Sequence, residues 1–260
     1  THAFQASGTV TSFDIMLKQF YNGAHFYRLD IEIIDASNNL INSELQPFMV
    51  FENAQFPTIS NLIVFGDSLS DMGNGKNSIL NVPDVPPYWQ GRFSNGQVWL
   101  EYLSQAYGVT TTIGSGTSVG GNRAFGGSQT GQGYSYLLLP NVGTQISNYL
   151  SNVQTSIPSN TVVSLWSGGN DFLYGTANAN TISANMESHI RQLESVGADE
   201  FIIPNLPPLE KTPEVMSWSQ TSHNTVDSAV VLSNHKLATR VGTLRIELGK
   251  TLNYREAWSL

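Results

Sequence analysis

Residues 62–71 read Leu-Ile-Val-Phe-Gly-Asp-Ser-Leu-Ser-Asp, and this stretch sets the expectation for the fold. Four apolar residues stop at Gly66, as in a buried strand of a parallel sheet. Similar apolar runs recur from Val162 to Trp166 and from Phe201 to Ile203. Helical stretches separate these runs, and the clearest extends from Val226 to Leu248. We therefore expect an α/β fold of three layers, in which helices cover both faces of a parallel sheet.

The amino-terminal part of the chain has a different pattern. From His25 to Ile33, apolar and polar residues alternate, which is typical of a half-buried antiparallel strand. The stretch from Thr11 to Leu17 alternates in the same way, and turn residues 35–39 precede the apolar stretch from Phe48 to Phe51. We predict a small β-rich unit over residues 1–57, with a packing role or a lipid- or partner-binding role, and a second domain over residues 58–260.

Composition narrows the range of functions. With 12 basic and 20 acidic side chains the net charge is −8, which opposes binding to nucleic acid. The chain has no cysteine, so disulfides, thiolate metal sites and cysteine nucleophiles are excluded, and we expect neither a cofactor nor a metal. The apolar runs are too short to cross a bilayer. Only 12% of residues are charged, and the chain begins at Thr1 without a leader, which we interpret as a processed, exported product.

The first strand is followed by a serine in a chemically useful place. A tight turn at Gly66 is expected to put Ser68 at the start of a helix. There its hydroxyl is exposed, and the backbone N–H groups of the helix end stabilise an anion. Serine at such a position also caps helices, so Ser68 is either a nucleophile or a cap.

Two other strand ends carry hydrogen-bond donors. In Ser167-Gly-Gly-Asn-Asp171, the side-chain amide of Asn170 is a donor, although the segment also suits an ordinary turn in which Asp171 caps a helix. In Asn122-Arg-Ala-Phe-Gly-Gly127, the paired glycines offer a backbone N–H. A nucleophilic hydroxyl, a backbone donor and an amide donor are the groups that acyl transfer requires.

In order along the chain, these segments resemble those of the GDSL (SGNH) hydrolases, in particular bacterial secreted lipases, lysophospholipases, thermolabile haemolysins and acyltransferases. The likeness extends from residue 61 to the end. It implies that Ser68 is the nucleophile and that the N–H of Ser68, the N–H of Gly127 and the side chain of Asn170 form the oxyanion hole, with Gly126 as the alternative to Gly127. The matching segments are Gly66-Asp-Ser-Leu-Ser-Asp71, Gly91-Arg-Phe-Ser-Asn-Gly96, Asn122-x-Ala-x-Gly-Gly127, Gly168-Gly-Asn-Asp171 and Asn205-Leu-Pro-Pro208.

The sequence departs from this family at the general base, a histidine in an Asp-x-x-His segment near the carboxyl end. None of the five histidines has an aspartate three residues before it. We expect His189 and His235 to be surface or internally bonded helix residues, and His223 to lie beside a helix start. We further expect that residues 1–260 are a fragment, with the acid and base on a missing or separate carboxyl-terminal piece. A domain that has lost catalysis is the alternative.

Three functions follow. The leading hypothesis is a secreted bacterial serine esterase that cleaves (lyso)phospholipids or related acyl esters through an acyl-enzyme, contacts membrane surfaces and transfers acyl groups. The second is a carbohydrate esterase of the same family. The third is a non-catalytic adhesion or binding module on an inactive fold. For the second hypothesis, the candidate sugar platforms are Trp89, Trp99, Trp166 and Trp218.

Overall fold

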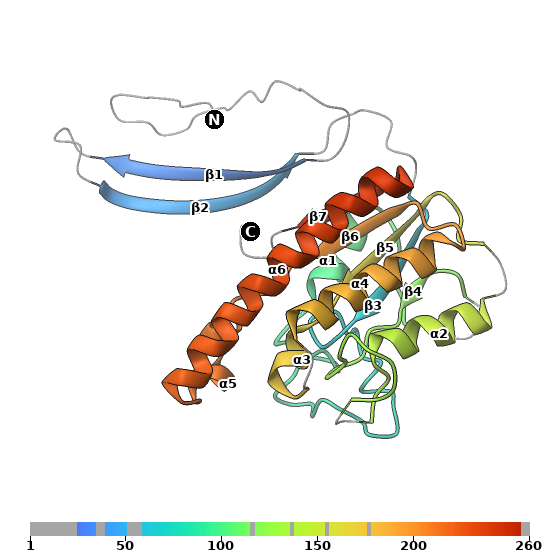
Figure 1. Cartoon of the computed structure of the whole chain (residues 1–260), viewed down its shortest axis with the longest axis horizontal. Coiled ribbons are helices and arrows are strands. Elements are labelled where there is room, and N and C mark those ends of the chain that lie inside the picture. The colour runs from blue at the N-terminus through green and yellow to red at the C-terminus, as the bar shows by residue number, and fades with distance from the viewer. Residues whose placement is uncertain are drawn as a thin grey trace. The chain divides into compact units, whose positions relative to one another are not determined.

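The computed structural model describes residues 25–34, 40–50, 59–114, 118–135, 138–153, 156–175 and 178–255. The chain divides into two compact units, residues 1–56 and 57–260, and each is described by itself (Figure 1). None of the helices in these ranges is long and apolar enough to span a membrane.

The first unit contains an antiparallel pair of strands. β1 (His25–Ile34) pairs with β2 (Leu40–Val50), and the register runs from His25 opposite Val50 to Ile34 opposite Leu40. The predicted antiparallel strand at residues 25–33 is therefore confirmed. β2 begins well before the apolar stretch at Phe48, because backbone pairing continues through polar residues that the hydrophobic pattern ignores. The predicted strand at residues 11–17 and the turn at 35–39 lie outside the described residues, and the role of this unit stays a prediction.

The second unit is built on a sheet whose described strands all run parallel, in the order β4-β3-β5-β6-β7. This confirms the predicted parallel sheet and its three predicted strands. The order reverses at β3, because β4 and β5 follow it in the chain but lie on opposite sides of it. Such a reversal opens a crevice at the carboxyl ends of the strands. The strands are β3 (Asn61–Gly66), β4 (Gly121–Asn122), β5 (Thr161–Trp166), β6 (Glu200–Pro204) and β7 (Thr251–Arg255).

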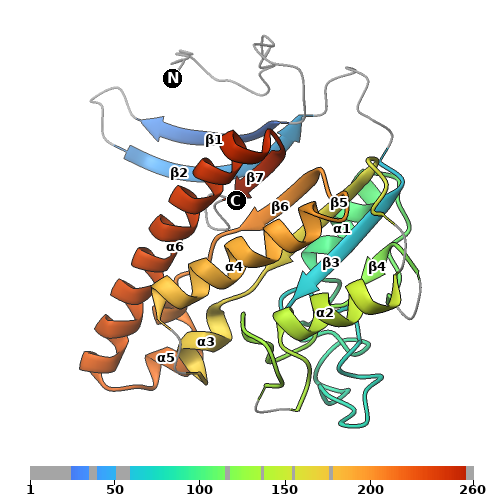
Figure 2. The ribbon, with the colours of Figure 1, turned by 45° about the vertical axis from the view of Figure 1, so that its right-hand side comes forward.

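Helices cover both faces of this sheet, as predicted for three layers. α2, α4 and α6 lie on one face, and α1 lies on the other (Figure 2). The helices are α1 (Trp99–Ala106), α2 (Val142–Asn152), α3 (Gly169–Leu173), α4 (Ala179–Glu194), α5 (Pro213–Met216) and α6 (Gln220–Leu248), with a 3₁₀ turn, η1 (Leu209–Lys211).

Alternate strand residues build the main core. Ile63 and Phe65 of β3 and Leu165 of β5 point into one buried cluster with residues of α2, α4 and α6. The ring of Phe65 meets the ring of Tyr149 edge-on, with 5.5 Å between centroids. Burying each such side chain contributes roughly 1.5–3 kcal/mol to folding, so this cluster anchors the strands that end at the crevice.

α6 is longer than the sequence pattern predicts. The pattern places its start at Val226, whereas the helix begins at Gln220 after the N-cap Ser219, whose hydroxyl accepts a hydrogen bond from the Ser222 N–H at 3.2 Å. Residues 220–225 are polar and carry no apolar period, so only the cap could reveal them. The helix ends at Leu248 as predicted, because Gly249 adopts a left-handed conformation with φ of 62°.

Candidate active site

The chain after β3 turns sharply instead of entering a helix. The N–H of Ser70 donates to the Asp67 carbonyl at 3.0 Å, and the N–H of Leu69 donates to Asp67 Oδ1 at 3.0 Å. The prediction that Ser68 starts a helix is wrong, because the next helix is α1, which begins at Trp99. Ser68 is therefore not the cap of a following helix.

The carboxylate of Asp71 explains why no helix forms here. Its Oδ1 accepts hydrogen bonds from the N–H groups of Gly73 at 2.8 Å and Asn74 at 2.6 Å. Its Oδ2 accepts one from the N–H of Gly75 at 3.1 Å. In a helix these N–H groups would donate to carbonyls four residues earlier. A side chain has taken their place, and the segment closes into a loop around it.

Gly66 and Gln145 hold the start of this turn. A Cβ atom at position 66 would lie 2.5 Å from the carbonyl oxygen of Trp166 on the neighbouring strand, so only glycine fits. The side chain of Gln145, in α2, accepts from the Gly66 N–H at 3.1 Å and donates to the Gly66 carbonyl at 2.9 Å. Gln145 could not be predicted from the sequence, because a single buried amide on a helix leaves no pattern.

Ser68 is half-buried at the tip of the turn. Neither its hydroxyl nor its backbone N–H hydrogen-bonds to any described residue. Its position at the carboxyl end of β3, where the strand order reverses, is where ligands enter sheets of this kind. Both groups are therefore available to a ligand.

The loop that follows β4 provides one unused N–H. In residues 126–130, Gly126 donates to Asp71 Oδ2 at 2.9 Å, and Ser128 donates to the Phe125 carbonyl at 3.3 Å. The N–H groups of residues 129 and 130 bind side-chain oxygens of residues 141 and 171, each at 2.9 Å. Within this segment only Gly127, with φ of 78°, keeps its N–H without an acceptor among the described residues. Gly127 therefore suits the oxyanion role better than Gly126, whose N–H is occupied.

Asn170 lies beside this loop. It belongs to α3, its side chain is buried, and its Nδ2 donates to the Ser128 carbonyl at 2.9 Å, one residue beyond Gly127. The Phe125 N–H in turn donates to the Gly66 carbonyl at 3.1 Å. Hydrogen bonds thus join the turn with Ser68, the loop with Gly127 and the helix with Asn170 at neighbouring strand ends.

Buried carboxylates surround these donors. Burial raises the pKa of Asp67 to about 7, and the charges of Asp171 and Asp71 add to this rise while the Leu69 N–H opposes it. Burial also raises the pKa of Asp171 to about 6, against the hydrogen bonds from Thr130. Burial raises the pKa of Asp71 as well, opposed by the N–H groups that bind its ionised form. The carboxylates influence one another because the motif segments converge. No group of acidic or histidine side chains in the described residues could hold a metal ion.

The described histidines, His189, His223 and His235, have different surroundings. His189 in α4 is buried, its Nε2 lies 2.7 Å from the Thr130 carbonyl, and burial lowers its pKa, which confirms its expected internal bonding. His235 is exposed on α6, as predicted, and His223 is half-buried in the first turn of that helix. None of these three side chains hydrogen-bonds to Ser68. The side chains of His2 and His25 lie outside the described part of the structure.

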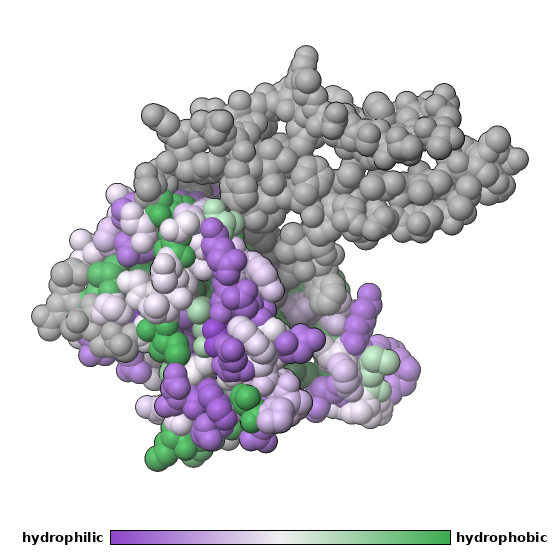
Figure 3. Space-filling model, turned by 180° about the vertical axis from the view of Figure 1, so that it is seen from behind, coloured by the Kyte–Doolittle hydropathy of each residue, from purple (hydrophilic) through white to green (hydrophobic). Residues whose placement is uncertain are grey.

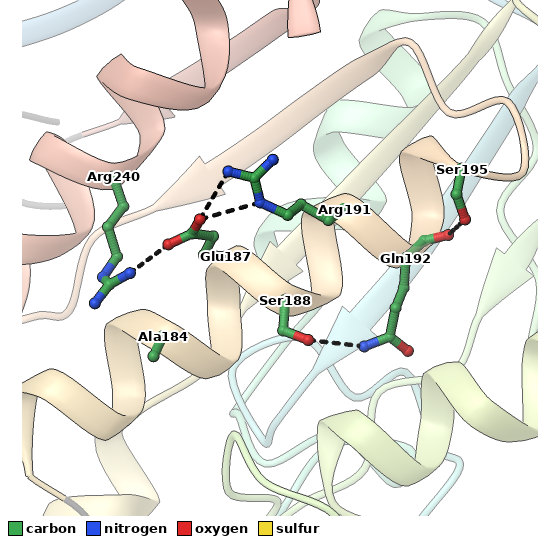
Figure 4. A pocket seen from close by; sticks show the side chains of 7 residues that line it. All are labelled: Ala184, Glu187, Ser188, Arg191, Gln192, Ser195 and Arg240. Carbon is green, nitrogen blue, oxygen red and sulfur yellow. Dashed lines mark hydrogen bonds and ion pairs between the residues drawn. The ribbon is translucent and has the colours of Figure 1, made fainter. Parts of the chain in front are cut away.

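A shallow depression on the outer surface of the sheet's helices is separate from this site. Figure 4 shows that Glu187 lies between Arg191 and Arg240, and Arg191 also pairs with Glu247 at 2.6 Å. The acidic and basic side chains in this depression thus neutralise one another, and neither Ser68, Gly127 nor Asn170 lines it. The lining residues are Ala184, Glu187, Ser188, Arg191, Gln192, Ser195 and Arg240.

Two bacterial proteins are similar in sequence. The phosphatidylcholine-sterol acyltransferase of Aeromonas hydrophila is 31% identical over 62% of this chain and 48% of its own length. The thermolabile hemolysin of Vibrio parahaemolyticus is 31% identical over 68% of this chain and 40% of its own length. The chain thus spans less than half the length of either relative.

Solved structures resemble the chain more distantly. Phospholipase A1 from Streptomyces albidoflavus is 16% identical with a TM-score of 0.44, over 75% of this chain and 78% of its own. A family two carbohydrate esterase from Clostridium thermocellum is 14% identical with a TM-score of 0.47, over 86% of this chain and 62% of its own. The family model for GDSL-like lipases and acylhydrolases matches residues 62–254, which include most or all of each described strand of the sheet and all three candidate site residues. The chain belongs to the family of GDSL-like lipases and acylhydrolases.

Proposed function

We propose that Ser68 attacks the carbonyl carbon of an acyl ester and forms an acyl-enzyme. Membership of the family supports ester hydrolysis. The observation that carries the assignment to these residues concerns the N–H groups of residues 126–130, of which only the Gly127 N–H has no acceptor among the described residues. That N–H lies on a loop bonded both to the turn with Ser68 and to the side chain of Asn170.

The proposed mechanism follows from these donors. As Ser68 Oγ bonds to the carbonyl carbon, negative charge develops on the carbonyl oxygen. The N–H groups of Ser68 and Gly127 and the amide of Asn170 donate to this oxygen, and each preorganised donor of this kind is worth roughly 100- to 1,000-fold in rate. Collapse of the intermediate expels the alcohol. Water then releases the free acid, or an acceptor alcohol takes the acyl group.

The Ser68 hydroxyl also needs a base, because a serine without one is a weak nucleophile at neutral pH. We propose that the imidazole belongs to an Asp-x-x-His segment outside residues 1–260, on the same polypeptide or on a separate carboxyl-terminal fragment. His223 is the alternative within the chain. Ester hydrolysis by residues 1–260, alone and with the added segment, tests this. An increase of about 100- to 10,000-fold on addition is expected. If residues 1–260 hydrolyse the ester equally fast with and without the added segment, and His223→Ala abolishes this activity, the base is His223.

Apolar side chains on the loops at the carboxyl ends of the strands support a lipid substrate. Figure 3 shows exposed hydrophobic residues of this unit as separate green patches among polar ones. Apolar side chains that loops present around a site can contact the acyl chain of a lipid substrate. The exposed large apolar residues of these loops are Leu69, Ile79, Leu80, Val85, Tyr88, Tyr134, Leu138 and Tyr174.

The relatives point to the same substrate class. One is named for acyl transfer from phosphatidylcholine to sterol, and another for haemolysis. We infer that this protein is a secreted bacterial enzyme that acts on (lyso)phospholipids and is able to pass the acyl group to an alcohol.

Two of the four candidate tryptophans, Trp99 and Trp166, give little support to a sugar substrate. The rings of Trp99 and Trp166 meet edge-on, with 5.5 Å between centroids. The Trp99 indole N–H donates to Ser70 Oγ at 3.3 Å, and that of Trp166 donates to the Asn205 carbonyl at 2.9 Å. Rings held in this way pack against the protein.

A substrate panel tests the proposal. The intact protein is assayed on lysophosphatidylcholine, on a short acyl ester and on an acetylated oligosaccharide, each with Ser68→Ala as the control. We expect turnover of the lysophospholipid and the short ester, and none by the variant. Preferred cleavage of the acetylated sugar would replace the lipid assignment with the carbohydrate esterase. No turnover of any of the three would favour the binding module.

A further inference from the structure

Two buried carboxylates hold the loop of residues 126–130 at its two ends. At one end, Asp71 Oδ2 accepts from the Gly126 N–H at 2.9 Å. At the other end, Asp171 Oδ2 accepts from the Thr130 N–H at 2.9 Å, and Asp171 Oδ1 accepts from the Thr130 hydroxyl at 2.7 Å. Asp71 follows the strand that leads to Ser68, and Asp171 follows Asn170 directly. The loop is therefore tied to both neighbouring motif segments.

We propose that Asp71 and Asp171 are positioning residues that fix the Gly127 N–H relative to Ser68 and Asn170. This inference rests on the proposed function, because it assigns a purpose to the position of an oxyanion donor. Gly127 lies between the two held residues and makes no protein hydrogen bond itself in the described structure. Gly127 has no side chain that could hold it in place. The hydrogen bonds of the Gly126 and Thr130 N–H groups therefore determine the direction in which the Gly127 N–H points.

Further contacts reinforce the same loop. The Nδ2 of Asn74, a neighbour of Asp71, donates to the carbonyls of Asn122 at 3.1 Å and Ala124 at 2.9 Å. The Thr130 carbonyl meets His189 Nε2 at 2.7 Å. The segment is thus bonded to the β3 turn before Gly127 and to α3 and α4 after it. A displacement of about 1 Å in such a site costs up to roughly 100-fold in rate.

The two carboxylates respond differently to replacement by an amide. Asp71 accepts two N–H groups on each oxygen, namely those of Gly73 and Asn74 on Oδ1 and those of Gly75 and Gly126 on Oδ2. An asparagine at position 71, in either orientation of its amide, would place its NH₂ group opposite two N–H groups. These are all donors, so no hydrogen bond forms between them.

At position 171 an amide fits. Its oxygen still accepts from the Thr130 N–H, and its NH₂ group donates to the Thr130 hydroxyl, which also accepts from Asn185 Nδ2 at 3.0 Å. A hydroxyl has two lone pairs and can accept both, so the Thr130 hydroxyl loses its acceptor on residue 171 but the Thr130 N–H, which holds the loop, keeps its own. If Asp71 and Asp171 hold the loop of residues 126–130, Asp71→Asn and Asp171→Ala should lower activity, whereas Asp171→Asn should be tolerated.

Steady-state kinetics of the intact protein on a short acyl ester test this pattern. We expect Asp71→Asn and Asp171→Ala to lower kcat about 10- to 100-fold with KM changed less than about threefold, and Asp171→Asn to lower kcat less than about threefold. In an Asn170→Ala background, Asp171→Ala should cost much less than it does alone, because both act on the same oxyanion. The exposed Asp227→Asn is the matched control, with unchanged kinetics. Equal losses for the two substitutions of Asp171, or independent losses in the double variant, would overturn the proposal.

A second readout does not depend on catalysis. Amide hydrogen exchange in a peptide that covers residues 126–130 should accelerate in Asp71→Asn and Asp171→Ala, and stay unchanged in Asp171→Asn and Asp227→Asn. Unchanged amide hydrogen exchange in Asp171→Ala would refute the positioning role of Asp171, even if Asp71→Asn fails to fold. If Ser68→Ala retains turnover, the proposed function is wrong. Amide hydrogen exchange then still decides whether Asp71 and Asp171 hold the loop of residues 126–130.

Discussion

Substitution of Asp67 by asparagine should stabilise the protein at neutral pH. Asp67 is 4% exposed, and burial raises its pKa from 3.8 to about 7. Folding therefore takes up a proton at this carboxyl between these pH values, and stability falls as the pH rises through them. At about 1.36 kcal/mol per pH unit, a pKa raised from 3.8 to about 7 costs roughly 4 kcal/mol above pH 7. An asparagine keeps an oxygen for the Leu69 N–H and carries no charge to bury.

Urea unfolding followed by tryptophan fluorescence measures this effect in the wild type and Asp67→Asn at pH 5.5 and 8. The Asp67 carboxyl alone should lower the free energy of unfolding by about 2 kcal/mol between these pH values, and the variant should lack this fall. Burial raises the pKa of Asp171 and lowers that of His189, so these two groups act in opposite directions. The test therefore compares the change in the free energy of unfolding between pH 5.5 and 8 in the wild type with the same change in Asp67→Asn.

Asp227→Asn is the matched control, because Asp227 is exposed on α6. It should keep the pH dependence of the wild type. If the stability of Asp67→Asn changes with pH in parallel with the wild type, Asp67 does not hold a proton at neutral pH in the folded state. The reasoning from its burial would then be refuted.

Three further substitutions test the site. Asn170→Ala should lower kcat roughly 100- to 1,000-fold, whereas a change confined to KM would assign Asn170 to substrate binding. Gln145→Ala leaves the buried N–H and carbonyl of Gly66 without their side-chain partner, so calorimetry should show a loss of about 1–3 kcal/mol, and an unchanged melting temperature would contradict this. Gly126→Ala puts a Cβ 2.2 Å from the ring of Phe93, so it should lower kcat, and Phe93→Ala in the same chain should restore part of it.

Three strands of the parallel sheet could be predicted from the sequence, because buried parallel strands are short apolar runs that stop at glycine or polar residues. The runs at Leu62, Val162 and Phe201 all became strands of one sheet. The site motifs follow strand ends, and parallel strands bring those ends to one edge. Ser68 and Asn170 could therefore be proposed as site residues from the sequence, whereas their roles and the role of Gly127 come from the resemblance to the GDSL (SGNH) hydrolases.

Side-chain capture of backbone groups could not be predicted. The helix expected at Ser68 is absent because the Asp71 carboxylate takes N–H groups that a helix would use. Gln145 reaches Gly66 across 79 positions of sequence, a distance that no local pattern encodes. The hydrogen bond from the Gly126 N–H to Asp71 could not be predicted either, and it supports the proposal of Gly127 over Gly126 as the oxyanion donor.

Covalent labelling of Ser68 tests the central claim most directly. The intact protein is treated with a fluorophosphonate, digested and analysed by mass spectrometry, beside Ser68→Ala and Asn170→Ala. We expect a single adduct on the peptide that contains Ser68, no adduct in Ser68→Ala, and labelling slowed by roughly 100-fold or more in Asn170→Ala. An adduct on another residue, or labelling retained in Ser68→Ala, would contradict this claim.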